Sequence, residues 1–476
     1  MIRRLVFIFA VATFVNPGVA LAEPQERTSS VGQREFVNLT VYNAGTALVH
    51  DRRRVHLDAG LNRIAWRDVS AQIEPTTALV DAIGGSNKVD VIEQNFDFDL
   101  FNPSALLQRY VGKDVIVVHD PSVAGEHETR ETARLLSADN GIVLQYRDRI
   151  ETGLRGHIAF PVSSSAFRDR PTLVLEMASR LSGSQTLDLS YLTGGLSWSA
   201  DYVGVLSSDE RHLALTGLVT LANTSGESYL DARLQLVAGN VNIIQPESLR
   251  TIANVSAEST SDTYSVGKFG QENYFEYHLY TLGRQTTILD KQTKQISLLS
   301  AHDVPIKKTL ELRGSQQYYR SEEPDLGDRL PVSAYVTFQN QNGDLGIPLP
   351  AGVVRLYKKD SRGLSQFLGS DQIEHTPKGE TVRLNLGNSF DVTARKRQTS
   401  FDEHRCSANS SYEIVVSNAK TMPQDVLVVE SIPGSWKIRA ESSPHVKSSA
   451  STADWTLHVP AEGRSTLTYS ARTSWC

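Results

Sequence analysis

Histidine and carboxylate side chains come close together in the segment His375-Thr376-Pro377-Lys378-Gly379-Glu380. A histidine near an acid can act as a general base whose ring the acid orients, so this spacing raises the possibility of a hydrolase site. Pro377 and Gly379 in the same segment are typical of a tight turn between strands, with Lys378 and Glu380 exposed to water. We favour the turn.

A second segment, Tyr274 to Tyr280, is the most aromatic stretch of the chain. If it forms one strand, alternation predicts that Phe275, Tyr277 and Leu279 face a core and that Tyr274, Glu276, His278 and Tyr280 face outward. Outward aromatic rings beside polar groups can stack on sugars or peptides, although packing under a neighbouring loop is the favoured alternative. The weak ligand candidates are therefore Tyr274, His278, Tyr280, His375 and Glu380.

Two further segments resemble metal sites only in part. Glu126-His127-Glu128 begins like the zinc motif HExxH, but position 131 is Glu rather than the second His. Asp97 and Asp99 would share one face of a strand and could hold calcium, although an edge strand with both acids in water is favoured. The sequence contains no GxSxG, GxxxxGK[ST], complete HExxH or paired-cysteine zinc spacing. We therefore assign no catalytic, cofactor-binding or metal-binding residue.

The chain contains only two cysteines, Cys406 and Cys476. In an exported protein, two thiols within one domain often form a disulfide, and this one would close a loop of 476 − 406 + 1 = 71 residues. Two free thiols are the alternative. The CxxC spacing of redox enzymes is absent, which argues against redox catalysis.

The first 22 residues have the three parts of a cleavable secretory signal. Arg3 and Arg4 form the positive end, Leu5 to Val15 is apolar, and Ala20-Leu21-Ala22 offers a cleavage site before Glu23. The apolar run is too short to span a bilayer as a helix, and no later segment is apolar for 18 residues. We expect a periplasmic or secreted protein with no transmembrane segment in the mature chain.

Composition narrows the possible partners. The 476 residues include 48 Lys and Arg and 54 Asp and Glu; removing Arg3 and Arg4 with the leader gives 46 − 54 = −8 for the mature charge. A mildly acidic chain without basic runs is a poor candidate for binding nucleic acid. An envelope protein or glycan is the expected partner.

The elements that must position these residues are short strands. Alternating runs rich in Val, Ile, Leu, Thr and Tyr, separated by turn residues, predict an all-β fold of several packed antiparallel β-sandwich modules. One short helix is predicted near residues 103–111, where Asn102 can cap, Pro103 suits the first turn and Gly112 can end it.

We place domain boundaries near 186 and 395. These give an N-terminal β-rich domain (23–185), a central β-sandwich (186–394) with a long polar loop at 247–272, and an immunoglobulin-like C-terminal β-sandwich (395–476). Trp436 and Trp455 are expected to anchor the last core. Trp198 and Tyr202 are four residues apart, so both rings face one core if their strand is unbroken.

Several blocks together resemble the bacterial family called domain of unknown function four-one-three-nine, over about residues 187–475. They are Leu189 to Tyr202, Asn223 to Glu227, Leu349 to Gly352, His375 to Glu380, Phe390 to Val392 and Arg395 to Gln398. The resemblance implies an exported, β-rich envelope protein, and it carries over no activity or catalytic residue. Tyr229 stands where many members have Trp, and the long coiled coil of the mucoidy-inhibitor-like members is missing.

These observations favour a non-enzymatic protein that binds or organises a cell-envelope component. One alternative is an envelope-acting hydrolase, metal-dependent, with His375 or His127 near its site. Another is a carbohydrate-binding protein that uses Tyr274, Tyr280, Tyr318 or Tyr319.

Overall fold

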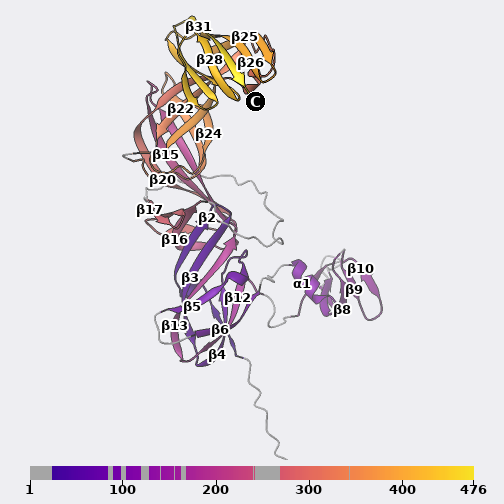
Figure 1. The fold of residues 1–476 in the computed structure, drawn as a ribbon. Helices are drawn as coiled ribbons and strands as arrows, with labels where there is room; N and C mark the ends of the chain where they lie inside the picture. Colours follow the sequence, from indigo (N-terminus) through magenta and orange to yellow (C-terminus); the bar gives the residue numbers. More distant parts are fainter. Residues whose placement is uncertain are drawn as a thin grey trace, which may run out of the picture. The chain divides into compact units, whose positions relative to one another are not determined.

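The computed structural model describes residues 24–83, 89–97, 103–119, 128–139, 141–154, 156–161, 168–239, 241, 269–341 and 344–476. These residues lie mostly in β-strands, which confirms the predicted all-β fold (Figure 1). The predicted leader, residues 1–22, lies outside the described residues. Internal contacts divide the chain into unit 1 (1–35, 51–71 and 75–190) and unit 2 (36–50, 72–74 and 191–476).

Unit 1 contains a four-stranded sheet whose order is β1-β4-β12-β6. Its strands are β1 (Glu26–Ser29), β4 (Gly60–Arg67), β12 (Thr172–Ser179) and β6 (Val89–Asp97). A further antiparallel pair joins β5 (Leu79–Ile83) to β13 (Gly183–Gly194). Three strands, β2 (Arg34–Tyr42), β3 (Thr46–Leu57) and β13, contribute residues to both units.

A charged cluster is buried within unit 1. Asp51 and Arg53, two residues apart on β3, both point inward, and the Arg53 guanidinium donates to the Asp51 carboxylate at 2.6 Å. Arg34 binds the same carboxylate at 2.9 Å, and Trp66 Nε1 donates to it at 3.2 Å. The partners satisfy a carboxylate that would otherwise be costly to bury, so this cluster is part of the scaffold.

The segment around the predicted helix forms a small module of its own in unit 1. The helix α1 (Pro103–Tyr110) is the one α-helix in the described part of the chain, and it confirms the prediction for 103–111. Leu106, Leu107 and Tyr110 pack on the module's core, as the helical spacing predicts. The sheet order is β10-β9-β8-β7-β11, with strands β7 (Asp114–His119), β8 (Thr129–Ser137), β9 (Val143–Gln145), β10 (Ile150–Thr152) and β11 (His157–Ala159).

Unit 2 begins with a five-stranded sheet of order β20-β15-β14-β23-β24. The strands are β14 (Leu196–Leu206), β15 (His212–Asn223), β20 (Gln292–Pro305), β23 (Gly352–Lys359) and β24 (Ser365–Ile373). Burial alternates along β14, and both Trp198 and Tyr202 are buried, which confirms the unbroken strand. Tyr202 also donates its hydroxyl to the carbonyl of Pro350 at 2.8 Å.

A second ladder in unit 2 runs β17-β18-β16-β2, and a short strand, β19 (Thr286–Ile288), also pairs with β16. The other strands are β16 (Tyr229–Ala238), β17 (Phe269–Tyr274) and β18 (Tyr277–Leu282). Tyr229 is fully buried, so the position that often holds Trp is indeed a core position. Most of the predicted loop 247–272 lies outside the described residues, and its residues 269–272 begin β17.

The C-terminal module is a nine-stranded arrangement of order β28-β31-β26-β25-β22-β21-β27-β30-β29. Trp455 is fully buried in its core, as predicted, whereas Trp436 is only partly buried at the margin. The strands are β21 (Lys307–Arg313), β22 (Leu330–Gln339), β25 (Thr381–His404), β26 (Ser407–Asn418), β27 (Gln424–Ser431), β28 (Ser435–Glu441), β29 (Val446–Ser449), β30 (Thr452–Val459) and β31 (Gly463–Ser474).

Most of the described pairings are antiparallel, but β1–β4, β14–β23, β16–β2 and β21–β27 are parallel. Parallel pairs join segments far apart in the sequence, which alternation alone does not reveal. The core of the C-terminal module also includes Leu310, Tyr319 and Val332, from upstream of residue 395. β25 runs through position 395 as one strand, and the boundaries near 186 and 395 stay predictions.

Candidate functional site

A groove of about 710 Å³ lies in unit 2 between the end of β20 and the end of β22. This volume is in the range of small-ligand sites in proteins. Five consecutive residues of β20 and three of β22 line it, so the walls are strand edges rather than strand faces. The lining residues are Ala301 to Lys307, Thr337 to Gln339, Gln341, Asp344, Leu345 and Thr381.

The groove is the opened end of a β-ladder. β20 passes into β21 through Ile306, and β21 pairs with β22 from Lys307 opposite Thr337. If this antiparallel register continued, Pro305 would face Gln339 and Asp303 would face Gln341. Proline has no N–H to donate, so the ladder ends there and the two strands part.

A β-bulge in β20 adds to the opening. Leu213 pairs with Val304 while Leu215 pairs with Ala301, so two residues, His302 and Asp303, bulge out opposite a single residue of β15. Asp303 has a φ of 58°, in the left-handed region. Bulges redirect side chains, and this one presents His302 and Asp303 at the groove as exposed groups.

Backbone groups of β22 also point into the groove. Asn340 N–H donates to the Glu380 carbonyl at 2.8 Å, and Gly379 N–H donates to the Asn340 carbonyl at 2.7 Å. Both groups of Asn340 therefore face β25, and Asn340 does not line the groove. Successive residues of a strand direct their N–H and C=O to opposite sides, so those of Gln339 face the groove.

The groove combines an apolar floor with a polar rim. Val304, Phe338 and Leu345 are almost fully buried and form the floor. The rim carries charges of both signs and side-chain amides, from His302, Asp303, Lys307, Gln339, Gln341 and Asp344. Such a surface suits a ligand with alternating apolar and polar groups, because the apolar parts can be buried while the rim bonds the polar parts.

The aromatic segment 274–280 forms a hairpin and not a single strand. β17 ends at Tyr274 and β18 begins at Tyr277, with Phe275 at the turn in the left-handed region (φ 57°). Leu279 is buried and Tyr274 is exposed, as predicted, but Phe275 is 87% exposed and Tyr280 is buried. The prediction that Phe275 faces a core and Tyr280 faces outward is wrong, because alternation does not continue through a turn.

The structure places Tyr280 and His375 around one loop, whereas the His278 ring contacts the Gln271 amide at 3.1 Å. Tyr280 donates its hydroxyl to the Pro348 carbonyl at 2.9 Å, and Ala351 N–H donates to His375 Nδ1 at 3.2 Å. Partial burial lowers the pKa of His375, against the opposing effect of the neighbouring Glu374 carboxylate. Both Tyr280 and His375 bond the backbone of residues 348–351, so they hold this loop.

Glu380 closes the predicted turn through its backbone, with its N–H donating to the Pro377 carbonyl at 3.3 Å. Gly379 has a φ of 88°, as expected for a glycine in such a turn. The turn interpretation of 375–380 agrees with this geometry.

Of the segments resembling metal sites, Asp97 is bound by the guanidinium of Arg168 at 3.0 Å. Asp99 and His127 lie outside the described residues. Glu131 is bound by Arg149 at 3.0 Å, as befits a charged surface. Over the described ranges, no group of three or more His, Cys, Asp or Glu side chains is placed to hold a metal ion.

Tyr318 and Tyr319 belong to a buried cage in the C-terminal module. Lys396, on β25, places its ammonium 2.6 Å from Glu430 Oε2, and both side chains are almost completely buried. Four tyrosine rings lie within 4.6–5.9 Å of this ammonium, those of Tyr318, Tyr319, Tyr412 and Tyr469. Tyr319 is fully buried and cannot stack on a sugar.

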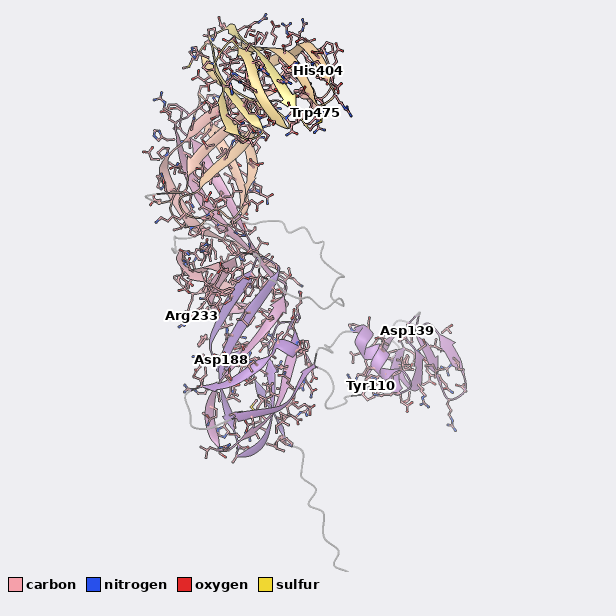
Figure 2. The ribbon with its side chains drawn as sticks, in the orientation of Figure 1. Tyr110, Asp139, Asp188, Arg233, His404 and Trp475 are labelled. Atoms are coloured by element: carbon pink, nitrogen blue, oxygen red, sulfur yellow. A yellow bond between two sulfur atoms is a disulfide. The ribbon has the colours of Figure 1, made fainter. Side chains whose placement is uncertain are left out.

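Cys406 and Cys476 form a disulfide, which confirms the predicted bond. It joins the residue before β26 to the end of the chain just beyond β31. Trp475 N–H donates to the Cys406 carbonyl at 3.1 Å, and Figure 2 shows Trp475 and His404 at the same end of the C-terminal module.

Glu210 should make stability depend on pH. Its carboxylate accepts from Lys308 at 2.5 Å and Lys358 at 2.6 Å. Partial burial alone would raise the pKa of Glu210, but the two lysines outweigh it and lower the pKa to about 2. The interaction of Glu210 with the two lysines therefore stabilises the fold above the unfolded-state pKa near 4.5, and this contribution is lost as pH falls toward 2.

Because these three side chains are each about one-third exposed, we expect the free energy of unfolding to fall by about 1 kcal/mol between pH 5 and pH 2.5, as measured by urea unfolding. Glu210→Gln is the control. It should show a smaller decrease over the same pH range, and an equal decrease in the variant would contradict the assignment to Glu210.

Sequence reasoning did not identify the groove. Its only local signals are the break in alternation at His302-Asp303 and the proline two residues later, and neither reveals the strand that lies opposite.

Comparison with known families gives one result. The family model described as Domain of unknown function (DUF4139) matches residues 187–476. No curated protein matches the chain. Among the described residues, no helix is both long enough and apolar enough to cross a membrane.

Proposed function

We propose that this chain, which belongs to the family described as Domain of unknown function (DUF4139), is an exported, non-enzymatic protein that binds a component of the cell envelope. The β20–β22 groove is the binding site in this proposal. Support comes from its volume, its apolar floor and the bulge that presents His302 and Asp303 at its rim.

The proposed address is the periplasm or the outside of the cell. The leader-like residues 1–22 and the Cys406–Cys476 disulfide both support it, because structural disulfides persist in oxidising compartments. Export would place the groove where envelope proteins and glycans are available as ligands.

A carbohydrate-binding function is the second candidate, and the hairpin tip favours it. Tyr274 is 61% exposed and Phe275 is 87% exposed, beside the carboxylate of Glu276. A bulky residue with positive φ is strained, and strained residues cluster at functional sites. Exposed rings next to an acid can stack on a sugar and bond its hydroxyls.

Site-specific photocrosslinking in cells tests both candidates. A benzophenone side chain at His302 is expected to form a discrete adduct with an envelope component, while the same group at Val446, which is 67% exposed on β29, should form none. An adduct from position 275 alone would support the hairpin tip instead.

The proposal fails if neither position gives an adduct above that of Val446. It also fails if the chain remains in the cytoplasm with residues 1–22 attached, which N-terminal sequencing of the recovered protein would detect.

A further inference from the structure

We propose that the β20–β22 groove binds an extended peptide segment, which adds to the open edge of β22 as a further strand. This inference rests on the proposed function and identifies the chemical class of the ligand. The main observation behind it is that consecutive residues of β20 and β22 line the groove, so both walls are strand edges.

Strand edges recognise peptides because an extended peptide presents alternating N–H and C=O groups at the same spacing. Gln339 directs its N–H and C=O into the groove, since its neighbour Asn340 uses both backbone groups toward β25. Thr337, the next residue on the same side, already pairs with Lys307. β21 pairs with β22 as far as Thr337. A bound strand would pair with β22 at the next residue on that side, Gln339.

β20 itself cannot pair with β22 at Gln339. Pro305, which would be the partner of Gln339, lacks an N–H, and the bulge at His302-Asp303 shifts the register beyond it. Bulges and prolines protect edges from unwanted pairing. Here both are on β20, so the N–H and C=O of Gln339 on β22 are the backbone groups that can pair with a ligand.

The size of the groove sets the length of the peptide. Residues 301–305 form one wall, and five residues of extended chain span about 17 Å. A bound segment of about four or five residues would fill the groove.

The side chains indicate which peptides would fit. Phe338 and Leu345 form an apolar floor under alternate positions of the ligand, and the remaining positions would face the polar rim. Lys307 and His302 lie on the same rim as Asp303 and Asp344. Charges of both signs disfavour a strongly charged ligand, so alternating apolar and neutral polar residues are expected.

The test uses the full exported chain and a phage-displayed library of random nonapeptides. Selected peptides should show the alternating pattern. Replacing Gln339 with Pro removes the N–H that faces the groove and leaves those that face β25, so binding should weaken about tenfold or more. Gln339→Ala, the matched control, removes the same side chain but keeps the N–H, so the tenfold loss in Gln339→Pro is measured against this variant.

Hydrogen exchange on the unmodified chain provides a readout that does not depend on the folding of a variant. A selected peptide should slow exchange at the Gln339 amide and leave the Asn340 amide, already bonded to Glu380, unchanged. Selected peptides that bind Gln339→Pro as well as Gln339→Ala, or that leave exchange at Gln339 unaffected, would overturn the inference.

A soluble digest of envelope glycan is the second probe in the exchange experiment. Protection of the groove by glycan, with no peptide selected, would overturn the peptide inference and leave the proposed function standing. Protection by neither probe, together with no crosslink from His302, would overturn both.

Discussion

Replacing Glu430 with Gln is expected to lower the free energy of unfolding by about 3 kcal/mol or more, as measured by urea unfolding. The carboxylate of Glu430 is the partner of a lysine that is itself 1% exposed, so the substitution leaves an ammonium buried without its counter-charge. Removing one member of a buried ion pair commonly costs 3–5 kcal/mol, because the remaining charge has lost access to water. Burial already lowers the pKa of Lys396, against the opposing effect of Glu430.

The surroundings of the pair are built to accommodate it. Tyr319 donates its hydroxyl to Glu430 Oε2 at 3.0 Å, and the tyrosine rings offer their electron-rich faces to the ammonium. Gly314 lies against the same carboxylate, and a Cβ at that position would collide with it. Only glycine therefore fits at position 314, directly after β21, because any side chain there would displace the Glu430 carboxylate.

The matched control is the same substitution at Glu210, whose partners are about one-third exposed and where we expect a loss of about 1 kcal/mol or less. A double variant, Lys396→Met with Glu430→Leu, should recover most of the loss, since apolar residues of similar volume can replace a buried pair. Equal effects of Glu430→Gln and Glu210→Gln would contradict the interpretation.

Elements specified by local signals were predictable from the sequence. The helix 103–110 begins at Pro103 and is followed by Gly112, which has a φ of 81°. Trp198 and Tyr202 lie on one unbroken strand, and Trp455 follows the alternation of β30. The disulfide followed from two cysteines in one expected domain. For the helix and the two strands, the sequence signal lies within the element that it specifies.

The hairpin at Tyr274–Tyr280 was not predictable by the same reasoning. Its turn contains no glycine, proline or asparagine, and Phe275 takes the left-handed conformation that those residues usually supply. Alternation restarts after a turn, which is why Tyr280 is buried although the unbroken pattern places it outside.

The groove and the ion pair depend on pairing between distant segments. The groove exists because β20 and β22, separated in sequence by all of β21, diverge at Pro305. Lys396 occupies an inward position in the alternation of β25, between Ala394 and Gln398, but its acceptor is 34 residues away on β27. No local signal in the sequence identifies either partner.

Removing the disulfide with Cys406→Ser and Cys476→Ser is expected to lower the free energy of unfolding of the C-terminal module by about 4 kcal/mol. The bond closes a loop of 476 − 406 + 1 = 71 residues. The loop-entropy relation gives a stabilisation of that order for the folded state, because the bond lowers the conformational entropy of the unfolded chain. Reducing the parent chain should have the same effect as the double substitution.

The structure of the folded module should change little when the disulfide is removed. Replacing Glu430, in contrast, leaves an unpaired charge in the folded core. β26 and β31 pair along their whole length, from Ser407 opposite Ser474 to Asn418 opposite Gly463, so their ends stay adjacent without the bond. Hydrogen exchange in the folded variant should rise only near residues 474–476, while the urea midpoint falls. Non-reducing thiol labelling of the parent chain should detect no free thiol, and two labelled cysteines, or an unchanged midpoint after reduction, would contradict the prediction.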